Sequence, residues 1–525
     1  MTKDSGPIMN VTSSTSARER LVTGLARTVL LVAFLVAFLA AVTNAAEHQA
    51  LPMGEFVSHI DVGNPAQKGS VVYDSQTQSY TVSGAGTNIW FDKDEFHFVY
   101  RQMKGDFILR TRADFIGQGT DPHRKLGWMV RSTLDTDSPH INAVVHGDGL
   151  TSLQLRRSTG AMTEEIRSEL TASDVIQLER RGDRYTMSVA RFGQLFEVSR
   201  CDEIKLGDEV LVGLFVCSHN PDVIETATFN NVRITVPAAE HFAPYRDYIG
   251  SRLETLDVDS GDRRVLFRTT DAIEAPNWMP NSDTLIYNSG GKLFQFSLSE
   301  RKPLLLNIGT AERCNNDHVL SFDGQRLGIS YHAADAGGDS VISTLPSTGG
   351  EPERVTMKSP SYLHGWSPDG KHLTFTGQRN DQFDIYRIPV DGGEEVRLTT
   401  AEGLDDGSEY SPDGQYIYFN SSRTGTMQIW RMKPDGTQQV QITHDELNDW
   451  FPHLSPDGKR MVFLSFSKDI PSEEHPFYKT VYLRSMPIGG GEPHVVAYVY
   501  GGQGTNNVPS WSADSQHLAF VSHTD

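Results

Sequence analysis

The sequence lacks clusters of Lys and Arg beyond residue 30, and its charge balance is strongly acidic. The 525 residues include 47 Lys and Arg against 67 Asp and Glu, which gives a formal net charge of −20. Nucleic-acid binding draws much of its affinity from cationic side chains that displace counterions from phosphates. We therefore expect no nucleic-acid partner, whereas an acidic, Asn-rich surface suits solubility, cations or neutral sugars.

Cysteine is also scarce. The chain holds only Cys201, Cys217 and Cys314, so at least one thiol is unpaired. Cys217 lies in the apolar run VLVGLFVCS, which is typical of a buried strand, and this argues against a disulfide between Cys201 and Cys217. The cysteine spacing offers no zinc site.

Several motifs of common enzymes are missing. The sequence has no G-x-S-x-G, no Walker loop, no H-E-x-x-H and no dinucleotide fingerprint. We therefore expect no nucleotide cofactor. The string DVDSG at residues 257–261 lacks the twelfth-position Glu of an EF-hand and is predicted to be a hairpin turn.

One long apolar run is present, from Val29 to Val42. Arg18, Arg20 and Arg27 precede it and small residues follow it, which is the order of a secretory signal peptide. We predict a signal peptide over residues 1–45 and export to the periplasm or the extracellular space. The alternative is an uncleaved N-terminal membrane anchor, although the run is short for a spanning helix.

The second half of the chain contains six copies of one unit, separated by about 44 residues. Each copy has a turn of the form S-P-D-G followed by alternating apolar residues. Four copies are WSPDGKHLTFTG from Trp366, YSPDGQYIYFNS from Tyr410, LSPDGKRMVFLS from Leu454 and WSADSQHLAFVS from Trp511. Two more divergent copies are WMPNSDTLIYNS from Trp278 and LSFDGQRLGIS from Leu320.

This period is typical of a four-stranded propeller blade, and six copies predict six blades. The last copy is followed by no further strand pair before Asp525. Residues 251–269 read as two strands around an Asp-Ser-Gly-Asp turn and precede the first copy. We expect this segment to complete the last blade and close the ring, which leaves no long open edge.

The S-P-D-G units over residues 245–525 resemble the β-propeller repeats of the TolB type. The resemblance implies a six-bladed β-propeller, for which we take the boundaries 239–525. TolB itself carries an α/β domain before its propeller, and the present sequence shows no such domain. We therefore do not carry over to this chain the role of TolB in its envelope system.

The first half has many short alternating segments without long helical periods, which favours a two-sheet β-sandwich. The stretches from Leu126 to Arg157 and from Val212 to Ile234 resemble concanavalin A-like jelly-roll domains of secreted bacterial proteins. The predicted fold class is therefore all-β, with a concanavalin A-like sandwich over residues 46–238 followed by the propeller. Several such sandwich domains contact carbohydrate.

A sugar site needs aromatic faces and polar side chains on a concave sheet. Five residues of the predicted sandwich have these properties and could share one face. They are Trp128, Arg131, His140, Asn142 and His146. The alternative is that Trp128 belongs to the core and the other residues face solvent.

The principal site is expected at the mouth of the propeller channel, where each blade enters its innermost strand. The segments just before the six repeats are polar at every entry. The candidate ligand-binding residues are Asn316, Asp317, His318, His364, Asp405, Asp406, Glu409, Asp449, His453, Gln503, Asn506 and Asn507.

Alignment on the repeat Ser puts His318 and His364 at the same position of adjacent blades, and His453 lies one residue away from it. Histidines beside carboxylates can form a divalent-metal site or an acid–base pair, so these three are the candidate metal ligands. The arrangement is similar to the oligogalacturonate lyases, whose propellers hold a metal at the channel mouth. The alternative is that each His is a hydrogen-bonded structural residue.

Three functions remain open from the sequence. The leading hypothesis is recognition of a glycan or another polar ligand at the channel mouth, with the sandwich as an accessory binder. The second is a metal-assisted oligosaccharide lyase or hydrolase. The third is a scaffold that docks a protein partner on the propeller.

Overall fold

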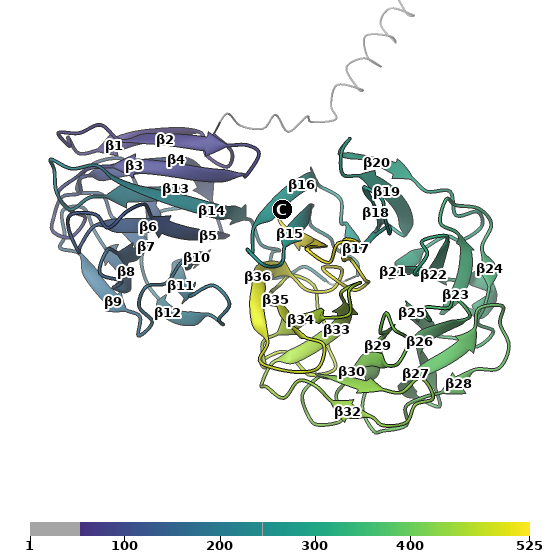
Figure 1. Cartoon of the computed structure of the whole chain (residues 1–525). Coiled ribbons are helices and arrows are strands. Elements are labelled where there is room, and N and C mark those ends of the chain that lie inside the picture. Colours follow the sequence, from purple (N-terminus) through teal and green to yellow (C-terminus); the bar gives the residue numbers. More distant parts are fainter. Residues whose placement is uncertain (1–52, 244) are drawn as a thin grey trace, which may run out of the picture. The chain divides into compact units, whose positions relative to one another are not determined.

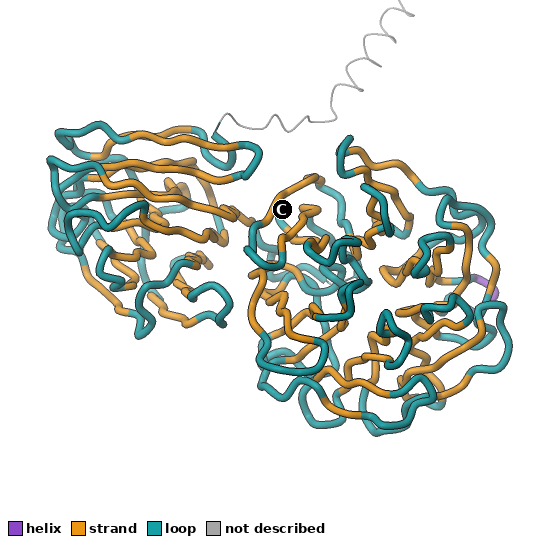
Figure 2. Tube along the Cα trace, viewed as in Figure 1, coloured by secondary structure: helices purple, strands orange, loops and turns teal. Residues whose placement is uncertain are grey.

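The computed structural model describes residues 53–243 and 245–525, and these residues are almost entirely strands and loops (Figure 2). The predicted signal peptide lies outside the described residues. The one helical element among the described residues is the 3-10 turn η1 (Ala334–Ala336). No helix in the described part of the chain has the length and apolarity needed to cross a membrane. Cys201, Cys217 and Cys314 are all buried free thiols.

The N-terminal half forms two seven-stranded antiparallel sheets (Figure 1). The first sheet has the order β1 (Ser58–Val62), β4 (Phe96–Lys104), β13 (Glu209–Cys217), β6 (Lys125–Arg131), β7 (His140–His146), β8 (Thr151–Arg156) and β9 (Glu164–Arg167). The second has the order β12 (Glu197–Cys201), β11 (Arg184–Ala190), β10 (Val175–Arg181), β5 (Phe107–Phe115), β14 (Glu225–Thr235), β3 (Ser79–Gly84) and β2 (Ser70–Asp74).

Both sheets contribute to one hydrophobic core. Trp128 of β6 and Leu109 of β5 belong to the same buried cluster, and neither is exposed to solvent. Strands alternate their side chains between two faces, so the odd-numbered neighbours of Trp128 point to the other side of the sheet. Arg131 and Met129 lie on that other face and are buried there as well.

The C-terminal half is a six-bladed β-propeller (Figure 1). Blade 1 consists of β17 (Glu274–Trp278), β18 (Thr284–Ser289), β19 (Lys292–Ser297) and β20 (Lys302–Leu305). Blade 2 consists of β21 (Cys314–Leu320), β22 (Arg326–His332), β23 (Ser340–Pro346) and β24 (Glu353–Arg354). Blade 3 consists of β25 (Ser361–Trp366), β26 (His372–Arg379), β27 (Gln382–Pro389) and β28 (Val396–Arg397). Blades 4 and 5 are β29 (Asp405–Tyr410), β30 (Ile417–Ser421), β31 (Gln428–Met432) and β32 (Val440–Gln441); β33 (Asn448–Leu454), β34 (Arg460–Phe466), β35 (Lys479–Pro487) and β36 (His494–Gly501).

The sixth blade joins the two ends of the repeat region. β15 (Ser251–Asp257) pairs with both β16 (Arg263–Thr269) and β37 (His517–His523). The expectation that residues 251–269 complete the last blade is therefore confirmed. The innermost element of this blade is a single bridge between Trp511 and Leu518.

The S-P-D-G turn recurs because its side chains satisfy its own backbone. In blade 3 the Ser367 hydroxyl donates to Asp369 Oδ1 at 2.6 Å and accepts the His372 amide at 2.9 Å. Gly370 takes a φ of +68°, a conformation that costs glycine little. The turn places β26 against β25, and the alternating residues Leu373 and Phe375 enter the core between blades.

Candidate functional site

The innermost strands of blades 1 to 5 each contain a β-bulge near the channel mouth. The register shifts lie between Glu274 and Asn277, Cys314 and His318, Leu363 and Gly365, Asp406 and Glu409, and Trp450 and His453. A bulge adds residues that have no cross-strand partner and turns their side chains out of the regular alternation. The polar run before each repeat is therefore the part of the strand that leaves the ladder and lines the mouth.

Side chains of the preceding blade hold these bulges in place. The Asn288 amide of β18 donates to the carbonyls of Cys314 and Asn315 at 2.9 and 2.7 Å. Asn420 of β30 accepts the Phe451 amide at 3.0 Å. Phe451 itself has a φ of +56°, a strained conformation for an aromatic residue that the surrounding contacts must impose.

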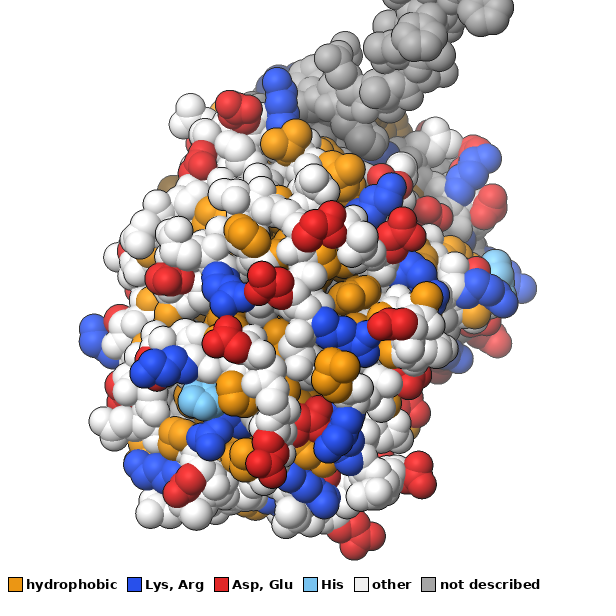
Figure 3. All heavy atoms as spheres, turned by 90° about the vertical axis from the view of Figure 1, so that its right-hand side faces the viewer, with side chains coloured by type: hydrophobic (Ala, Val, Ile, Leu, Met, Phe, Trp, Pro, Cys, Tyr) orange, Lys and Arg blue, Asp and Glu red, His pale blue; other side chains and the backbone are white. Residues whose placement is uncertain are grey.

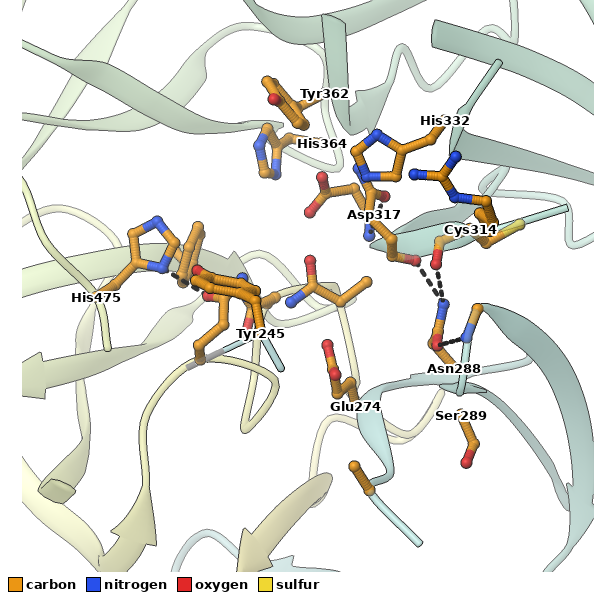
Figure 4. Close-up of a pocket in the computed structure, with 18 of the residues that line it drawn as sticks. Tyr245, Glu274, Asn288, Ser289, Cys314, Asp317, His332, Tyr362, His364 and His475 are labelled. Atoms are coloured by element: carbon orange, nitrogen blue, oxygen red, sulfur yellow. Dashed lines mark hydrogen bonds between the residues drawn. The ribbon is translucent and has the colours of Figure 1, made fainter. Parts of the chain in front are cut away.

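A cavity of about 1160 Å³ lies at this mouth and receives side chains from all six blades (Figure 4). Its polar lining includes Glu274, Asn288, Asn316, Asp317, His364, Asp406, His475, Gln503 and Asn507. Its aromatic lining includes Tyr245, Tyr248, Tyr362, Phe383 and Phe451. This mixture of apolar faces and convergent polar groups is typical of a small-molecule site.

Two carboxylates of the cavity, Glu274 and Asp317, have no cationic partner. Among the described residues no Lys, Arg or His forms an ion pair with either of them, and the Asp317 side chain is 6 % exposed. Burial raises the pKa of Asp317 to about 7, and burial together with the charge of Asp317 raises the pKa of Glu274 to about 7. Both carboxyl groups therefore titrate close to neutral pH.

His364 and Asp406 form the paired part of the cavity. His364 Nε2 lies 2.9 Å from Asp406 Oδ1, which also accepts the Thr376 hydroxyl at 2.6 Å and the Gly407 amide at 2.8 Å. Burial alone would lower the pKa of His364, but the charges of Asp406 and Asp317 outweigh it and the pKa is raised. Burial likewise opposes ionisation of Asp406, yet His364 brings its pKa down to about 2.

The loop between β34 and β35 brings His475 to the mouth. Its Nδ1 lies 2.6 Å from Gln503 Oε1, and its ring contacts Trp450 edge-on with centroids 4.5 Å apart. Asn507 Nδ2 donates to the same Gln503 oxygen at 2.9 Å. Burial lowers the pKa of His475, which favours the neutral form of this imidazole.

The structure divides the twelve predicted mouth residues into two equal groups. The residues that line the cavity are Asn316, Asp317, His364, Asp406, Gln503 and Asn507. The residues that do not line it are His318, Asp405, Glu409, Asp449, His453 and Asn506.

Strand alternation explains much of the second group. Asp405 is the neighbour of Asp406 and points away from the cavity, where Arg423 Nη2 lies 2.8 Å from it. Asp449 forms an ion pair with Arg484 at 2.5 Å and accepts the Ser465 hydroxyl at 2.8 Å.

Glu409 and His453 bind each other at 2.8 Å, below the mouth. His453 Nε2 lies 2.9 Å from the Asn506 carbonyl oxygen. Asn506 Oδ1 in turn accepts the Ser510 hydroxyl at 2.8 Å. These contacts hold neighbouring blades together.

The three candidate metal ligands do not share a site. His364 faces the cavity, whereas His318 Nε2 lies 3.2 Å from the Ile286 carbonyl oxygen and His453 is held by Glu409. The bulges cause the difference, because His364 is itself a bulged residue and His318 lies past the bulge of its strand. Within the described part of the chain, no group of three or more His, Cys, Asp or Glu is arranged to hold a metal ion.

The five residues predicted to bind a ligand in the N-terminal half are all buried. Trp128 packs in the core between the sheets, as the alternative interpretation expected. On the other face of the sheet, Arg131 and His140 lie 3.5 and 3.6 Å from Asp94.

Two further residues on this face keep unpaired polar atoms. Asn142 leaves both of its side-chain polar atoms without a partner. His146 Nε2 lies 3.2 Å from Gln154 Nε2, and its Nδ1 has no partner. This strip is therefore one part of the N-terminal half that still offers unused hydrogen-bonding groups.

Sequence reasoning missed Glu274, Tyr362 and His475. Glu274 and Tyr362 occupy the same position as Asn316, Asp406 and Asn507, four residues before the first residue of each repeat copy. The repeat alignment therefore contained their signal. His475 belongs to a loop outside the repeat and had none.

A second cavity, of about 310 Å³, was also not predicted. Its lining includes the first residue of five repeat copies, Trp278, Leu320, Trp366, Leu454 and Trp511, and residues of the turns such as Phe322 and Pro456. None of its lining residues lines the mouth cavity.

Comparisons with known proteins agree with the propeller. A family model described as the TolB beta propeller domain matches residues 359–475. The uncharacterized protein Atu1656 of Agrobacterium fabrum is 45 % identical over 272 residues, which span 52 % of this chain and 92 % of the relative. A solved structure of a TolB-like protein of Agrobacterium tumefaciens is 44 % identical with a TM-score of 0.51, and the match covers 53 % of this chain and 100 % of that chain.

An oligogalacturonate lyase in complex with manganese is a more distant structural neighbour. It is 13 % identical with a TM-score of 0.36, and the match covers 72 % of this chain and 97 % of that chain. At this level the likeness carries no argument about ligand or mechanism.

Proposed function

The chain belongs to the family of TolB-like β-propeller proteins that includes Atu1656, and from this premise we propose that it binds a glycan or a similar polar ligand at the channel mouth. The observation that supports the proposal is the cavity of about 1160 Å³. Its side-chain amides can donate and accept hydrogen bonds to hydroxyl groups, and its aromatic rings offer apolar faces.

Tyr362 provides the most direct test of this proposal. Its ring lies beside the cavity (Figure 4), so a Tyr362→Ala variant should lose binding to any glycan that a glycan array identifies with the intact protein. Phe322→Ala is the matched control, because Phe322 is 42 % exposed and lines only the other cavity. A ligand that binds both variants equally well would place the site elsewhere.

A second candidate function is hydrolysis or lysis of an oligosaccharide in the same cavity. Glu274 and Asp317 line the same cavity and titrate close to neutral pH, and two such carboxyl groups can serve as acid and base in glycoside cleavage. The metal-assisted form that the sequence suggested gains no support, because the three histidines are held apart. Release of reducing sugar by the intact protein and its loss in Asp317→Asn would favour the enzyme over the binder.

A protein-interaction scaffold is the third possibility that the sequence left open. A protein partner that still binds the Tyr362→Ala variant would favour docking on the outer blades over a ligand at the mouth. Affinity capture with the intact protein and with that variant separates the two cases.

We further propose the domain limits and the location. Residues 1–45 act as a signal peptide, residues 46–238 form a concanavalin A-like domain that assists ligand binding, and residues 239–525 form the propeller. N-terminal sequencing of the mature protein after cell fractionation tests this directly. A first residue of Ala46 supports export with cleavage, and an intact N-terminus in the membrane fraction supports an anchor.

A further inference from the structure

The cavity at the channel mouth carries an excess of negative charge. Its lining holds five carboxylates, those of Asp271, Glu274, Asp317, Asp406 and Glu473, and one guanidinium, that of Arg313. Arg313 is an exposed residue at the edge of the cavity. On the outer face in Figure 3, by contrast, Lys and Arg alternate with Asp and Glu. The charge of one sign is therefore concentrated inside the site.

Only part of this charge is neutralised within the protein. His364 pairs with Asp406 at 2.9 Å, which leaves Glu274 and Asp317 without a counter-ion among the described residues. No described residue donates a hydrogen bond to the Asp317 carboxylate, and only 6 % of this residue is exposed to solvent. Ionisation of a buried carboxyl group without a partner is costly, and a cationic ligand would remove this cost.

The remaining lining suits a sugar. Gln503 presents its amide nitrogen, and Tyr362 and Phe451 present aromatic rings, whereas the amides of Asn288 and Asn507 already bind the protein. An ammonium group donates three hydrogen bonds and accepts none, which is the complement of two carboxylates.

Resting on the binding function proposed above, we infer that the ligand is an amino sugar oligosaccharide with free amines, whose ammonium group lies between Glu274 and Asp317. An N-acetylated sugar brings no charge to this pair. A uronic acid brings a charge of the wrong sign and is repelled. The site therefore selects cationic glycans over neutral and acidic ones.

The binding is coupled to proton release. Burial raises the pKa of both carboxyl groups to about 7, and a cation between them favours their ionised forms. Other titratable or charged groups that line the same cavity are Tyr245, Tyr248, Asp271, Arg313, Cys314, His332, Tyr362, His364, Asp406, Glu473 and His475. Binding of the cationic sugar near neutral pH should therefore release protons from Glu274 and Asp317 into the buffer.

Calorimetry on the full chain tests the inference with two matched probes, a β-1,4-linked glucosamine tetramer and its fully N-acetylated form, at pH 6.5. We expect the glucosamine tetramer to bind at least tenfold more tightly. Asp317→Asn and Glu274→Gln keep the shape of each side chain and should each reduce this preference about tenfold. Phe322→Ala should leave it unchanged. Titrations in two buffers of different ionisation enthalpy should show net proton release for the intact protein and less for either variant.

The outcomes separate the two proposals. Equal affinity for the two tetramers, or a preference for the acetylated one, overturns the amino sugar inference and leaves glycan binding intact. No binding of either tetramer overturns the amino sugar inference; the glycan array of the intact protein then decides glycan binding, and a blank array overturns both proposals. If Asp317→Asn does not fold, Glu274→Gln and the proton count of the intact protein still decide the question.

Discussion

Two clusters of buried charge in this molecule look alike in composition and differ in how they are satisfied. The Asp94 cluster of the N-terminal sheets consists of Asp94, Arg131, His140 and Arg156. Arg156 binds both carboxylate oxygens of Asp94 at 2.9 and 2.7 Å, and all four side chains are fully buried. The mouth cluster of the propeller consists of Glu274, Asp317, Asp406 and His364.

The difference lies in the groups left over. In the Asp94 cluster the surplus positive charge is held by carbonyl oxygens, since Arg131 donates to Thr133 at 2.6 Å and Arg156 to Ala161 at 2.8 Å. In the mouth cluster the surplus is negative, and it faces a cavity. A fully satisfied charge network stabilises one structure, whereas an unsatisfied one retains the capacity to bind. Burial of a polar residue is therefore a weaker sign of function than an unused charge beside an open space.

The largest expected effect breaks the Asp94 cluster. Asp94→Asn should lower the free energy of unfolding by about 3–5 kcal/mol, because Arg131 and Arg156 lose their buried counter-ion. Urea denaturation followed by circular dichroism measures this, with Asp92→Asn at an exposed neighbouring position as the control. A loss below about 1 kcal/mol would mean that the carbonyl oxygens alone are enough to stabilise the two buried arginines.

The same substitution in the mouth cluster should act in the opposite direction. The pKa of Asp317 is raised from 3.8 to about 7 on folding, so its ionisation costs stability as the pH rises from 4 through 7. Asp317→Asn removes this cost and should stabilise the protein by about 2–4 kcal/mol at pH 8. The gain should vanish below pH 4, where both states are protonated. Thermal unfolding against pH, with the exposed Asp391→Asn as control, checks the sign.

Asp406→Asn tests the paired half of the mouth cluster. Burial lowers the pKa of His364, and Asp406 is the main group that raises it, so the substitution should bring this pKa below its usual range. The loss of the ion pair should cost about 1–3 kcal/mol. NMR titration of the His364 ring, assigned with His364→Gln, measures the shift; an unchanged pKa would assign the effect to Asp317.

Substitution of Asp449 should give the smallest effect of the four. Its charge is paired, as in the Asp94 cluster, but the residue lies on a strand of the propeller mouth. It binds Arg484, as the Asp94 cluster binds its arginines, but Arg484 keeps a second partner in Asp445 at 2.6 Å. Because Asp445 still neutralises Arg484, Asp449→Asn should change the free energy of unfolding by less than about 1 kcal/mol at pH 7. A larger loss in urea denaturation would show that Asp445 does not compensate.

The number of blades and the closing strand followed from the sequence because they repeat at a fixed distance. The bulges did not, since they depend on hydrogen bonds from a neighbouring blade, such as Asn420 to Phe451. Without the bulges, His318 and His364 look equivalent, and Asp405 looks as available as Asp406. Local pattern therefore located the mouth, and tertiary contacts selected which side chains face it.

The pairing of β15 with β37 also has a consequence for synthesis. The ribosome completes β15 at Asp257, but its partner begins only at His517, so the edge of β15 stays open until blades 1 to 5 have been made. Gln503 and Asn507 emerge in the same late stretch. A chain that stops before Gln503 thus has neither a closed ring nor a complete ligand cavity, because both depend on segments that lie far apart in the sequence.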